Sequence, residues 1–188
     1  MTTQYDYPYV LNVMADDHPG IVAAVTSVIE TLNGNIDCCS QTVLGGYFTL
    51  IMIISLPEAI DPELLGQKVR AVHPDFQVSA RVMKKDLPAQ DESGNNRFVI
   101  TAFGKDQPTI VKRFSMYLSD REINIVDLYG DRRGDEFVLI GQVEVPNHWD
   151  LTMLQSELQY LGQEFGFTVK LQHQNIFLAT NQLRLPWE

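Results

Sequence analysis

Residues 17–36 read DHPGIVAAVTSVIETLNGNI, and residues 106–125 read DQPTIVKRFSMYLSDREINI. The two stretches align without a gap at an offset of 89 residues, and they share identical residues at their beginnings and at their ends. An internal match at a fixed offset is the sequence signature of a repeated structural module. These stretches therefore predict that the chain contains the same fold twice.

The match extends in both directions at the same offset. Identical pairs are Val10 and Val99, Gly45 and Gly134, Phe48 and Phe137, Leu50 and Leu139, Pro57 and Pro146, and Leu65 and Leu154. Later the offset becomes 91, where FQVSARV (76–82) aligns with FTVKLQH (167–173). The polar segment KKDLPAQDESGNN (84–96) between the copies is typical of a linker. We therefore expect a first module over 1–83, a second over 97–173 and a C-terminal tail over 174–188.

Hydrophobic periodicity predicts the order β-α-β-β-α-β in each copy. In the first copy we expect strands at 7–14, 36–44 and 47–56, and helices beginning near residue 21 and spanning 61–72. In the second copy we expect strands at 97–103, 123–130 and 136–145, and helices beginning near residue 110 and spanning 150–162. A final strand closes each copy. This order is that of the ferredoxin-like split unit, so the predicted class is α+β, with each antiparallel four-stranded sheet carrying two helices on one face.

The residues before each predicted helix suit a helix start. An aspartate precedes each of the four: Asp17, Asp61, Asp106 and Asp150. Aspartate side chains accept hydrogen bonds from the first free N–H groups of a helix. Pro19 and Pro108 stand where a first-turn proline is tolerated. We expect these aspartates to cap their helices.

Two apolar segments predict contacts beyond the helices. The strand at 47–56 (YFTLIMIISL) is almost continuously apolar, which is typical of a strand covered on both faces. The sister module, a second subunit or the tail could cover its second face. The tail at 174–188 (QNIFLATNQLRLPWE) carries large apolar side chains that are seldom fully solvated, so we expect it to dock on the modules or on a partner subunit.

Composition excludes several classes of function. Lys and Arg number 14 and Asp and Glu number 24, for a net charge of −10, which disfavours direct nucleic-acid binding. The motifs GxSxG, CxxC and HExxH are absent, and the four histidines do not have metal-ligand spacing, so we expect no enzyme activity, no metal and no cofactor. The longest apolar run, 50–54, is too short to span a membrane. We expect a cytoplasmic protein in which the neighbours Cys38 and Cys39 are free thiols.

The turn before the first predicted helix, together with Asn35, is the strongest candidate for a binding site. The turn before the first helix contains Asp17, Pro19, Gly20 and Ile21, and its free N–H groups suit an anion. Asn35 opens the next strand and offers both donors and an acceptor, as a small zwitterion requires. A structural alternative is that Pro19 and Gly20 only start a helix and that Asn35 only turns the chain.

These residues carry a resemblance to a known family. DHPGIVAAV followed by NGNI closely resembles the amino-acid-binding ACT domain, whose signature is a DRPG-like turn and a G-x-N-I entry to the second strand. DQPTIVKRF followed by REINI resembles it more loosely. The tandem arrangement covers nearly the whole chain, and VLGGYFTLIMIIS (43–55) resembles the first module of the glycine cleavage system transcriptional repressor family.

The resemblance implies a ligand site and a function. Its ligand-binding residues would be Asp17, Pro19, Gly20, Ile21, Asn35 and Ile36, with a weaker second site at Asp106, Thr109, Ile110 and Asn124. Thr109 replaces the glycine that matches Gly20, and its Cβ crowds a close backbone approach. In many ACT domains the asparagine reaches a ligand held between two modules.

The function expected from this resemblance is that of a non-enzymatic regulator. It would sense a small amino acid, with glycine as the candidate, and act through protein contact on a transcription regulator. The alternative is an ACT regulatory subunit of a separate amino-acid metabolic enzyme. The chain would also form a homo-oligomer, because ACT modules commonly associate.

Overall fold

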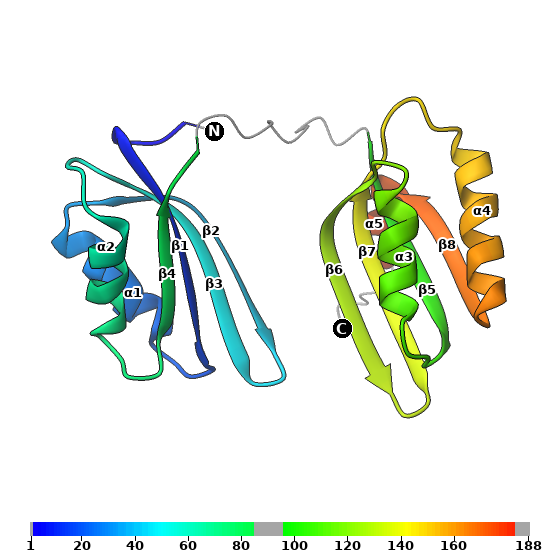
Figure 1. Ribbon diagram of the computed structural model, residues 1–188, viewed down its shortest axis with the longest axis horizontal. Helices are drawn as coiled ribbons and strands as arrows, with labels where there is room; N and C mark the ends of the chain where they lie inside the picture. The colour runs from blue at the N-terminus through cyan, green and yellow to red at the C-terminus, as the bar shows by residue number, and fades with distance from the viewer. Residues whose placement is uncertain (1, 85–95, 183–188) are drawn as a thin grey trace. The chain divides into compact units, whose positions relative to one another are not determined.

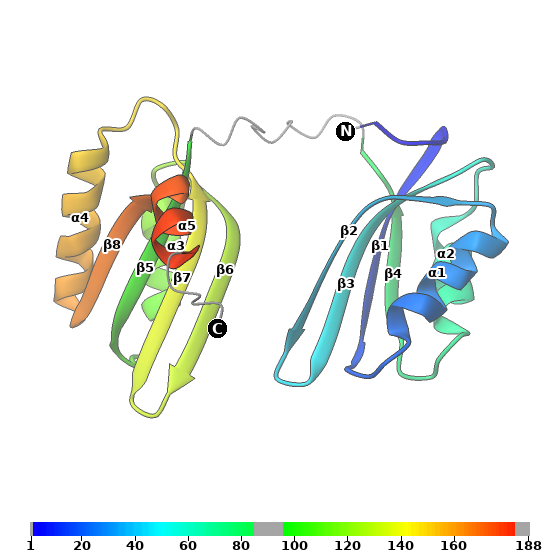
Figure 2. The ribbon, with the colours of Figure 1, turned by 180° about the vertical axis from the view of Figure 1, so that it is seen from behind.

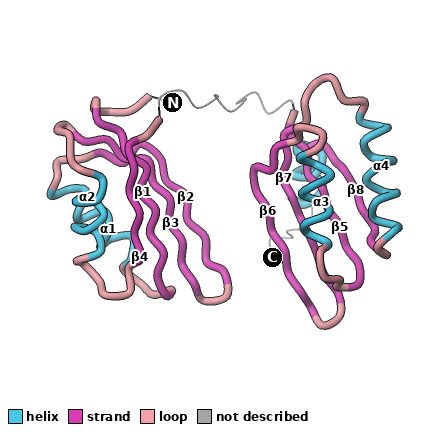
Figure 3. The backbone as a smooth tube through the Cα atoms, in the orientation of Figure 1, coloured by secondary structure: helices cyan, strands magenta, loops and turns pink. Residues whose placement is uncertain are grey.

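A computed structural model describes residues 2–84 and 96–182 of the chain. It divides into two compact units, residues 1–89 and 90–188 (Figure 1). Each unit contains one four-stranded antiparallel sheet, shown as magenta strands in Figure 3. Most of the expected linker and the last six residues of the expected tail lie outside the described residues.

The first unit has the order β-α-β-β-α-β. Its elements are β1 (Tyr7–Asp16), α1 (Ile21–Thr31), β2 (Asn35–Leu44), β3 (Tyr47–Leu56), α2 (Pro62–Arg70) and β4 (Gln77–Val82). The sheet order is β2-β3-β1-β4, so β1 and β3 form the centre of the sheet and β2 and β4 form its edges. This topology confirms the expected ferredoxin-like fold for the first copy.

The second unit repeats this order and adds a helix. Its elements are β5 (Arg97–Lys105), α3 (Ile110–Ser119), β6 (Asn124–Arg133), β7 (Glu136–Glu144), α4 (Leu151–Glu164), β8 (Phe167–His173) and α5 (Gln174–Gln182). The sheet order is β6-β7-β5-β8, which matches the first sheet strand for strand. No helix of the described part is long and apolar enough to cross a membrane. Cys38 and Cys39 are free and exposed, as expected.

Each hydrophobic core lies between the sheet and its two main helices. Alternate residues of β1 are buried, from Tyr9 through Leu11 and Val13 to Ala15, because successive strand side chains point to opposite faces. The second core is equivalent and takes residues from β5, β7, β8, α3 and α4. The two helices of each copy therefore cover one face of their sheet, as predicted.

The opposite faces of the two sheets differ. On β3, Ile51 is 46% exposed and Tyr47 is 61% exposed, so the second face of this apolar strand is not covered within the described first unit. In the second unit, α5 contacts β5 and β8 and lies over the sheet face opposite α3 and α4 (Figure 2). Val99 on that face of β5 is buried at 6% exposure. The α5 helix thus gives the second sheet a partial cover.

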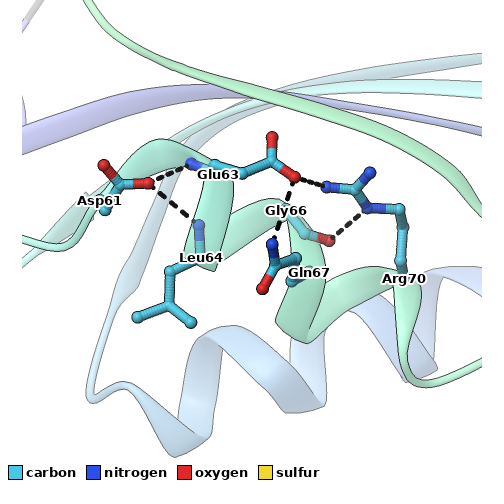
Figure 4. Close-up of polar contacts among 6 residues, drawn as sticks. All are labelled: Asp61, Glu63, Leu64, Gly66, Gln67 and Arg70. Carbon is cyan, nitrogen blue, oxygen red and sulfur yellow. Dashed lines mark hydrogen bonds and ion pairs between the residues drawn. The ribbon is translucent and has the colours of Figure 1, made fainter.

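The four main helices begin in two different ways. Asp61 accepts hydrogen bonds from the N–H groups of Glu63 and Leu64 (Figure 4), and Asp150 accepts one from Met153 at 2.9 Å. These two aspartates cap α2 and α4, as predicted.

The expected caps on α1 and α3 are wrong. Gly20 and Thr109 occupy the N-cap positions, so Asp17 and Asp106 lie three residues earlier and Pro19 and Pro108 precede the first turn. Within the described chain, no side chain caps either helix. The left-handed backbone of the N-cap residue turns the chain before the aspartate can reach the helix.

Candidate functional site

The turn before α1 leaves its first backbone N–H groups without a side-chain acceptor among the described residues. Gly20 has φ 98°, and the first turn of α1 contains no acidic residue. The backbone N–H of Asp17 donates to the carbonyl of Gly46 at 2.8 Å, which fixes this turn against the β2–β3 hairpin. A helix N-terminus of this kind favours a carboxylate or another small anion.

The second copy repeats this turn with one substitution. The N–H of Asp106 donates to the carbonyl of Asp135 at 2.7 Å, and α3 also lacks an acidic first turn. Thr109 takes the left-handed conformation of Gly20, with φ 79°. Its β-branched side chain stands at the point where the first copy exposes bare backbone. The second copy therefore carries a side chain where the first copy has bare backbone.

A histidine pair lies beside the first turn. His18 is half-buried, its Nδ1 is 3.0 Å from the carbonyl oxygen of Pro19, and its ring centroid lies 4.9 Å from that of His73. The His73 ring packs in turn against Phe76. This stack holds the loop after β1 against the segment before β4.

The structure does not bring the turn and Asn35 together within one module. Asp16 pairs with Tyr47, whereas Asn35 pairs with Ser55, and these partners lie about 27 Å apart along β3. The α1 helix, about 16 Å long, separates Gly20 from Asn35. The predicted site residues therefore form two groups at opposite ends of the first module.

Asn35 and Ile36 line an open pocket of about 560 Å³, which we call the α1–β2 pocket. Its walls come from the last turns of α1, the loop to β2 and the N-terminal segment. The lining residues are Tyr5, Thr26, Ile29, Glu30, Asn33, Gly34, Asn35 and Ile36. The pocket offers oxygen acceptors from two asparagines, one threonine and one glutamate.

A similar pocket of about 420 Å³ lies at the same place in the second module. Its lining residues are Ser115, Ser119, Glu122, Ile123, Asn124 and Ile125, each of which matches a residue of the first pocket at the offset of 89. Asn33 and Glu122 also share a left-handed backbone, with φ 53° and 57°. The repeat therefore preserves the pocket while changing its chemistry.

Asp37 fixes Asn35 in the first pocket. The Asn35 amide Nδ2 donates to Asp37 Oδ1 at 2.8 Å, and the backbone N–H of Gln4 donates to the same oxygen at 2.9 Å. The N–H of Tyr5 donates to the hydroxyl of the fully buried Ser55 at 3.1 Å. Burial opposes ionisation of Asp37, but hydrogen bonds from Ser55, Gln4 and Asn35 outweigh it and lower the pKa of this carboxyl. Asp37 is therefore an anion that ties the N-terminal segment and Asn35 together.

The second module lacks this arrangement. Val126 stands where the first module has Asp37, and Glu144 stands where it has Ser55. Glu144 instead pairs with Arg97 at 3.4 Å. The side chain of Asn124 has no hydrogen-bond partner among residues 2–84 and 96–182. The two equivalent asparagines thus have different surroundings.

Sequence reasoning missed Asp37, Glu30 and Ser55. A signal was present in the repeat, because Asp37 and Ser55 match apolar Val126 and charged Glu144 although Asn35 and Ile36 are preserved as Asn124 and Ile125. The hydrogen bonds that Asp37 accepts from Asn35 and Gln4 were not visible in the sequence, because they depend on where the N-terminal segment lies.

A family model for the ACT domain matches the chain twice, over residues 8–82 and 96–172. The chain belongs to the ACT-domain family. The two matched segments coincide with the two sheets and their main helices, so the predicted family is confirmed.

Curated relatives correspond to single modules. A UPF0237 protein from Methanosarcina acetivorans is 32% identical over 84 residues, which are 44% of this chain and 91% of the relative. A UPF0237 protein from Methanopyrus kandleri is 46% identical over 79 residues, which are 42% of this chain and 88% of the relative. These ACT relatives contain about half as much sequence as the tandem chain.

Two solved structures share the tandem fold. An unknown protein from Galdieria sulphuraria has a TM-score of 0.72 at 24% identity, and the match covers 88% of this chain and 97% of that one. A protein described as a candidate glycine cleavage system transcriptional repressor has a TM-score of 0.63 at 19% identity, over 88% and 95% of the two chains. At these identities the likeness shows the fold.

Proposed function

We propose that this ACT protein is a non-enzymatic cytoplasmic regulator that senses a small amino acid. The observation that carries the proposal is the exposed turn at Gly20, where an uncapped helix N-terminus offers N–H donors to a carboxylate. The α1–β2 pocket offers the complementary acceptors for an ammonium group. Glycine is the candidate ligand, since one solved structure of similar fold is described as a candidate glycine cleavage system transcriptional repressor.

The two halves of the site would come from two copies of the chain. The ammonium and carboxylate of an α-amino acid are attached to the same carbon atom, so one ligand cannot reach both ends of α1. The better turn and the better pocket both belong to the first module. A homodimer in which the turn of one chain faces the pocket of another would supply both groups to one ligand.

The output would be a protein contact with a transcription regulator. A net charge of −10 opposes direct binding to a phosphate backbone, so the regulator would supply the DNA contacts. The rival function is regulation of a separate metabolic enzyme, which the same ACT fold would serve equally well.

Titration and copurification test these proposals. Calorimetric titration of the full chain with the common amino acids should give saturable binding for glycine or a similarly small amino acid. Affinity purification of the chain, with and without that ligand, should recover a DNA-binding protein. Recovery of a metabolic enzyme would favour the rival function, and a lack of binding by every amino acid would contradict the sensor.

A further inference from the structure

We propose that the uncovered face of the first sheet is a docking surface for the same face of a second copy of this chain. This face, called the open face below, lies opposite α1 and α2 (Figure 1). Its apolar side chains come from β1, β2 and β3 and are Val10, Met14, Leu44, Tyr47, Ile51 and Ile53. The contact goes beyond the proposed function, and it differs from the ligand-linked contact, which involves the two ends of α1.

Strand pairing and burial place these side chains on one face. Leu11 and Met52 are paired with each other and are buried under the helices. Successive side chains of a strand point to opposite faces, so Asn12 and its partner Ile51 point away from the helices. Exposed fractions range from 40% to 68% for Met14, Ile51, Tyr47 and Leu44. Apolar surface gathered on one face in this way is typical of an interaction site.

The open face lacks charges that the matching face of the second module carries. The charged residues on that face of the second sheet include Asp127, Asp131, Arg133, Glu136 and Lys170. The residues at the matching positions of the first sheet are uncharged, namely Cys38, Thr42, Leu44, Tyr47 and Ser79. Burying an unpaired charge is costly, and the centres of protein interfaces are depleted of charged residues. The open face therefore suits burial against a copy of itself better than burial against the second module.

Two charges on the open face are placed so that a two-fold axis would pair them. Asp16 lies at the end of β1, whereas Arg81 on the neighbouring strand β4 pairs with Val10. The two residues are thus about 20 Å apart along the strands. A two-fold axis that crosses the strands at the level of Val13 reverses the strand direction between the copies. Asp16 of each copy then lies at the level of Arg81 of the other copy, which gives two complementary pairs in one dimer.

The size of the open face fits a dimer of moderate affinity. The N-terminal segment covers the end near Ser55, whose hydroxyl accepts a hydrogen bond from the N–H of Tyr5. The Asp37 carboxylate accepts a hydrogen bond from the same segment, so it lies outside the contact. The remaining face, from Val10 to Asp16 along β1 and across the four strands, measures about 23 by 19 Å. Two such faces bury on the order of 900 Å² before side-chain relief is added, close to the roughly 1,000 Å² that a specific interface needs.

Sedimentation equilibrium of the full-length protein without any amino acid tests the contact. We expect a monomer–dimer equilibrium at micromolar concentrations. Ile51 pairs with Asn12, next to the axis, so Ile51→Glu brings two like charges together and should weaken the dimer at least about tenfold. Ile140→Glu makes the same change at the matching position of the second module and should leave the dimer unchanged. A protein that stays monomeric overturns the proposal, and so does a dimer that is weakened equally by both variants.

A dimer that persists in Ile51→Glu also overturns the proposal, but it leaves the ligand-linked dimer of the proposed function in place. A charge exchange then tests the arrangement of the two copies. Asp16→Arg and Arg81→Asp should each weaken the dimer about tenfold, because each faces a like charge in the other copy. The variant with both changes restores opposite charges and should recover most of the affinity. A double variant as weak as the single ones would overturn the two-fold pairing of the open faces.

The neighbouring cysteines provide a readout in the folded wild-type surface. Cys38 pairs with Ile53 on the open face, whereas Cys39 pairs with the buried Met52 and points to the other side. Both thiols are exposed in the single chain. In the single-thiol variants Cys39→Ser and Cys38→Ser, iodoacetamide should react with Cys38 more slowly as the protein concentration rises, and with Cys39 at a constant rate. Protection of Cys38 that does not depend on protein concentration would show that the same chain covers the face, and it would overturn the proposal.

Discussion

Gly20 and Thr109 have nearly the same backbone conformation but different consequences for a ligand. A Cβ built on Gly20 would meet no atom within 4 Å, so the surrounding protein leaves room for a side chain. The positive φ is what favours glycine at this position. Thr109 adopts the same region at a strain of about 1–2 kcal/mol. The chain therefore tolerates a side chain at this turn in the second copy, while only the first copy leaves the backbone open.

The asymmetry of the two asparagines is testable by truncation. Asn35→Ala should weaken glycine binding roughly 10–150-fold, because it removes a hydrogen bond to a charged ligand group worth about 1.5–3 kcal/mol. Asn124→Ala should matter less, since Thr109 narrows its turn and Val126 leaves its amide without an anchor. Calorimetric titration of both variants checks this expectation.

A thermal melt of the same variants provides the control. Asn35→Ala also removes the hydrogen bond to Asp37, so a small loss of stability is expected without ligand. A large fall in melting temperature would indicate that Asn35 serves the turn, and equal losses of binding in the two variants would contradict the asymmetry.

At the residue scale the sequence indicated candidate site residues but not the distances between them. The repeat singled out Gly20 and Asn35 because they recur at matched positions or change between copies. Their separation depends on the pairing of Asp16 with Tyr47 and of Asn35 with Ser55, which no local pattern specifies. Asp37 was missed for a similar reason, because its contact with the backbone of Gln4 joins segments that lie 33 residues apart in the sequence.

A polar cluster joins α3 to α4 in the second module. Glu157 accepts hydrogen bonds from the Tyr117 hydroxyl at 2.8 Å and from Arg121 at 2.8 and 3.0 Å, and the Arg121 guanidinium stacks on the Tyr117 ring at 3.8 Å. The indole of Trp149 donates to the carbonyl of Arg121. The first module has apolar Val28, Leu32 and Ile60 at the positions of Tyr117, Arg121 and Trp149. The second copy thus adds a polar cluster to the apolar packing that it shares with the first copy.

This cluster predicts a pH-dependent contribution to stability. The Tyr117 hydroxyl and Arg121 lower the pKa of Glu157 below its ordinary 4.5, so the unfolded state binds the proton more readily than the folded state. Stability from Glu157 is therefore present above about pH 4.5 and is lost as the pH falls through the lower folded value. Glu157→Gln should cost about 1 kcal/mol at neutral pH, reduced by the 35% exposure of the side chain.

Urea unfolding of wild type and Glu157→Gln measures this contribution. The difference should shrink as the pH falls below 4.5 and through the lowered pKa of folded Glu157, because the wild-type carboxyl then also becomes protonated. Glu164→Gln, on the exposed face of the same helix, is the matched control and should change little. A difference that stays constant with pH would show that the charge of Glu157 does not contribute.

At the element scale the sequence predicted nearly all of the secondary structure. The spacing of apolar residues is typical of a helix or a strand in each segment, and the matching segment of the other copy has the same spacing. The starts of α2 and α4 followed directly from Asp61 and Asp150. The starts of α1 and α3 did not, since a left-handed N-cap residue overrides the usual capping pattern. The core tolerates paired changes as well: Gly34 lies against Leu56, and the second copy has Ile123 and Val145 at these positions.

At the scale of the whole molecule, the separation of turn and pocket means that the proposed ligand site would need a second copy of the chain. In a two-fold dimer each site would take its turn from one chain and its pocket from the other. A ligand that binds only the dimer stabilises it by mass action. The proposed sensor would then convert the concentration of an amino acid into the population of one assembly.

Mixing two inactive variants tests this shared site. Gly20→Thr copies the crowded second turn into the first module, and Asn35→Ala removes the acceptor of the pocket, so neither homodimer should bind glycine well. A mixed dimer contains one site with an intact turn from the Asn35→Ala chain and an intact pocket from the Gly20→Thr chain. With equal amounts and free exchange, about a quarter of all sites should recover the wild-type affinity. Calorimetry of the mixture, compared with each variant alone, measures the recovered stoichiometry. A site formed within a single chain would gain nothing from mixing, since each chain would keep its own defect.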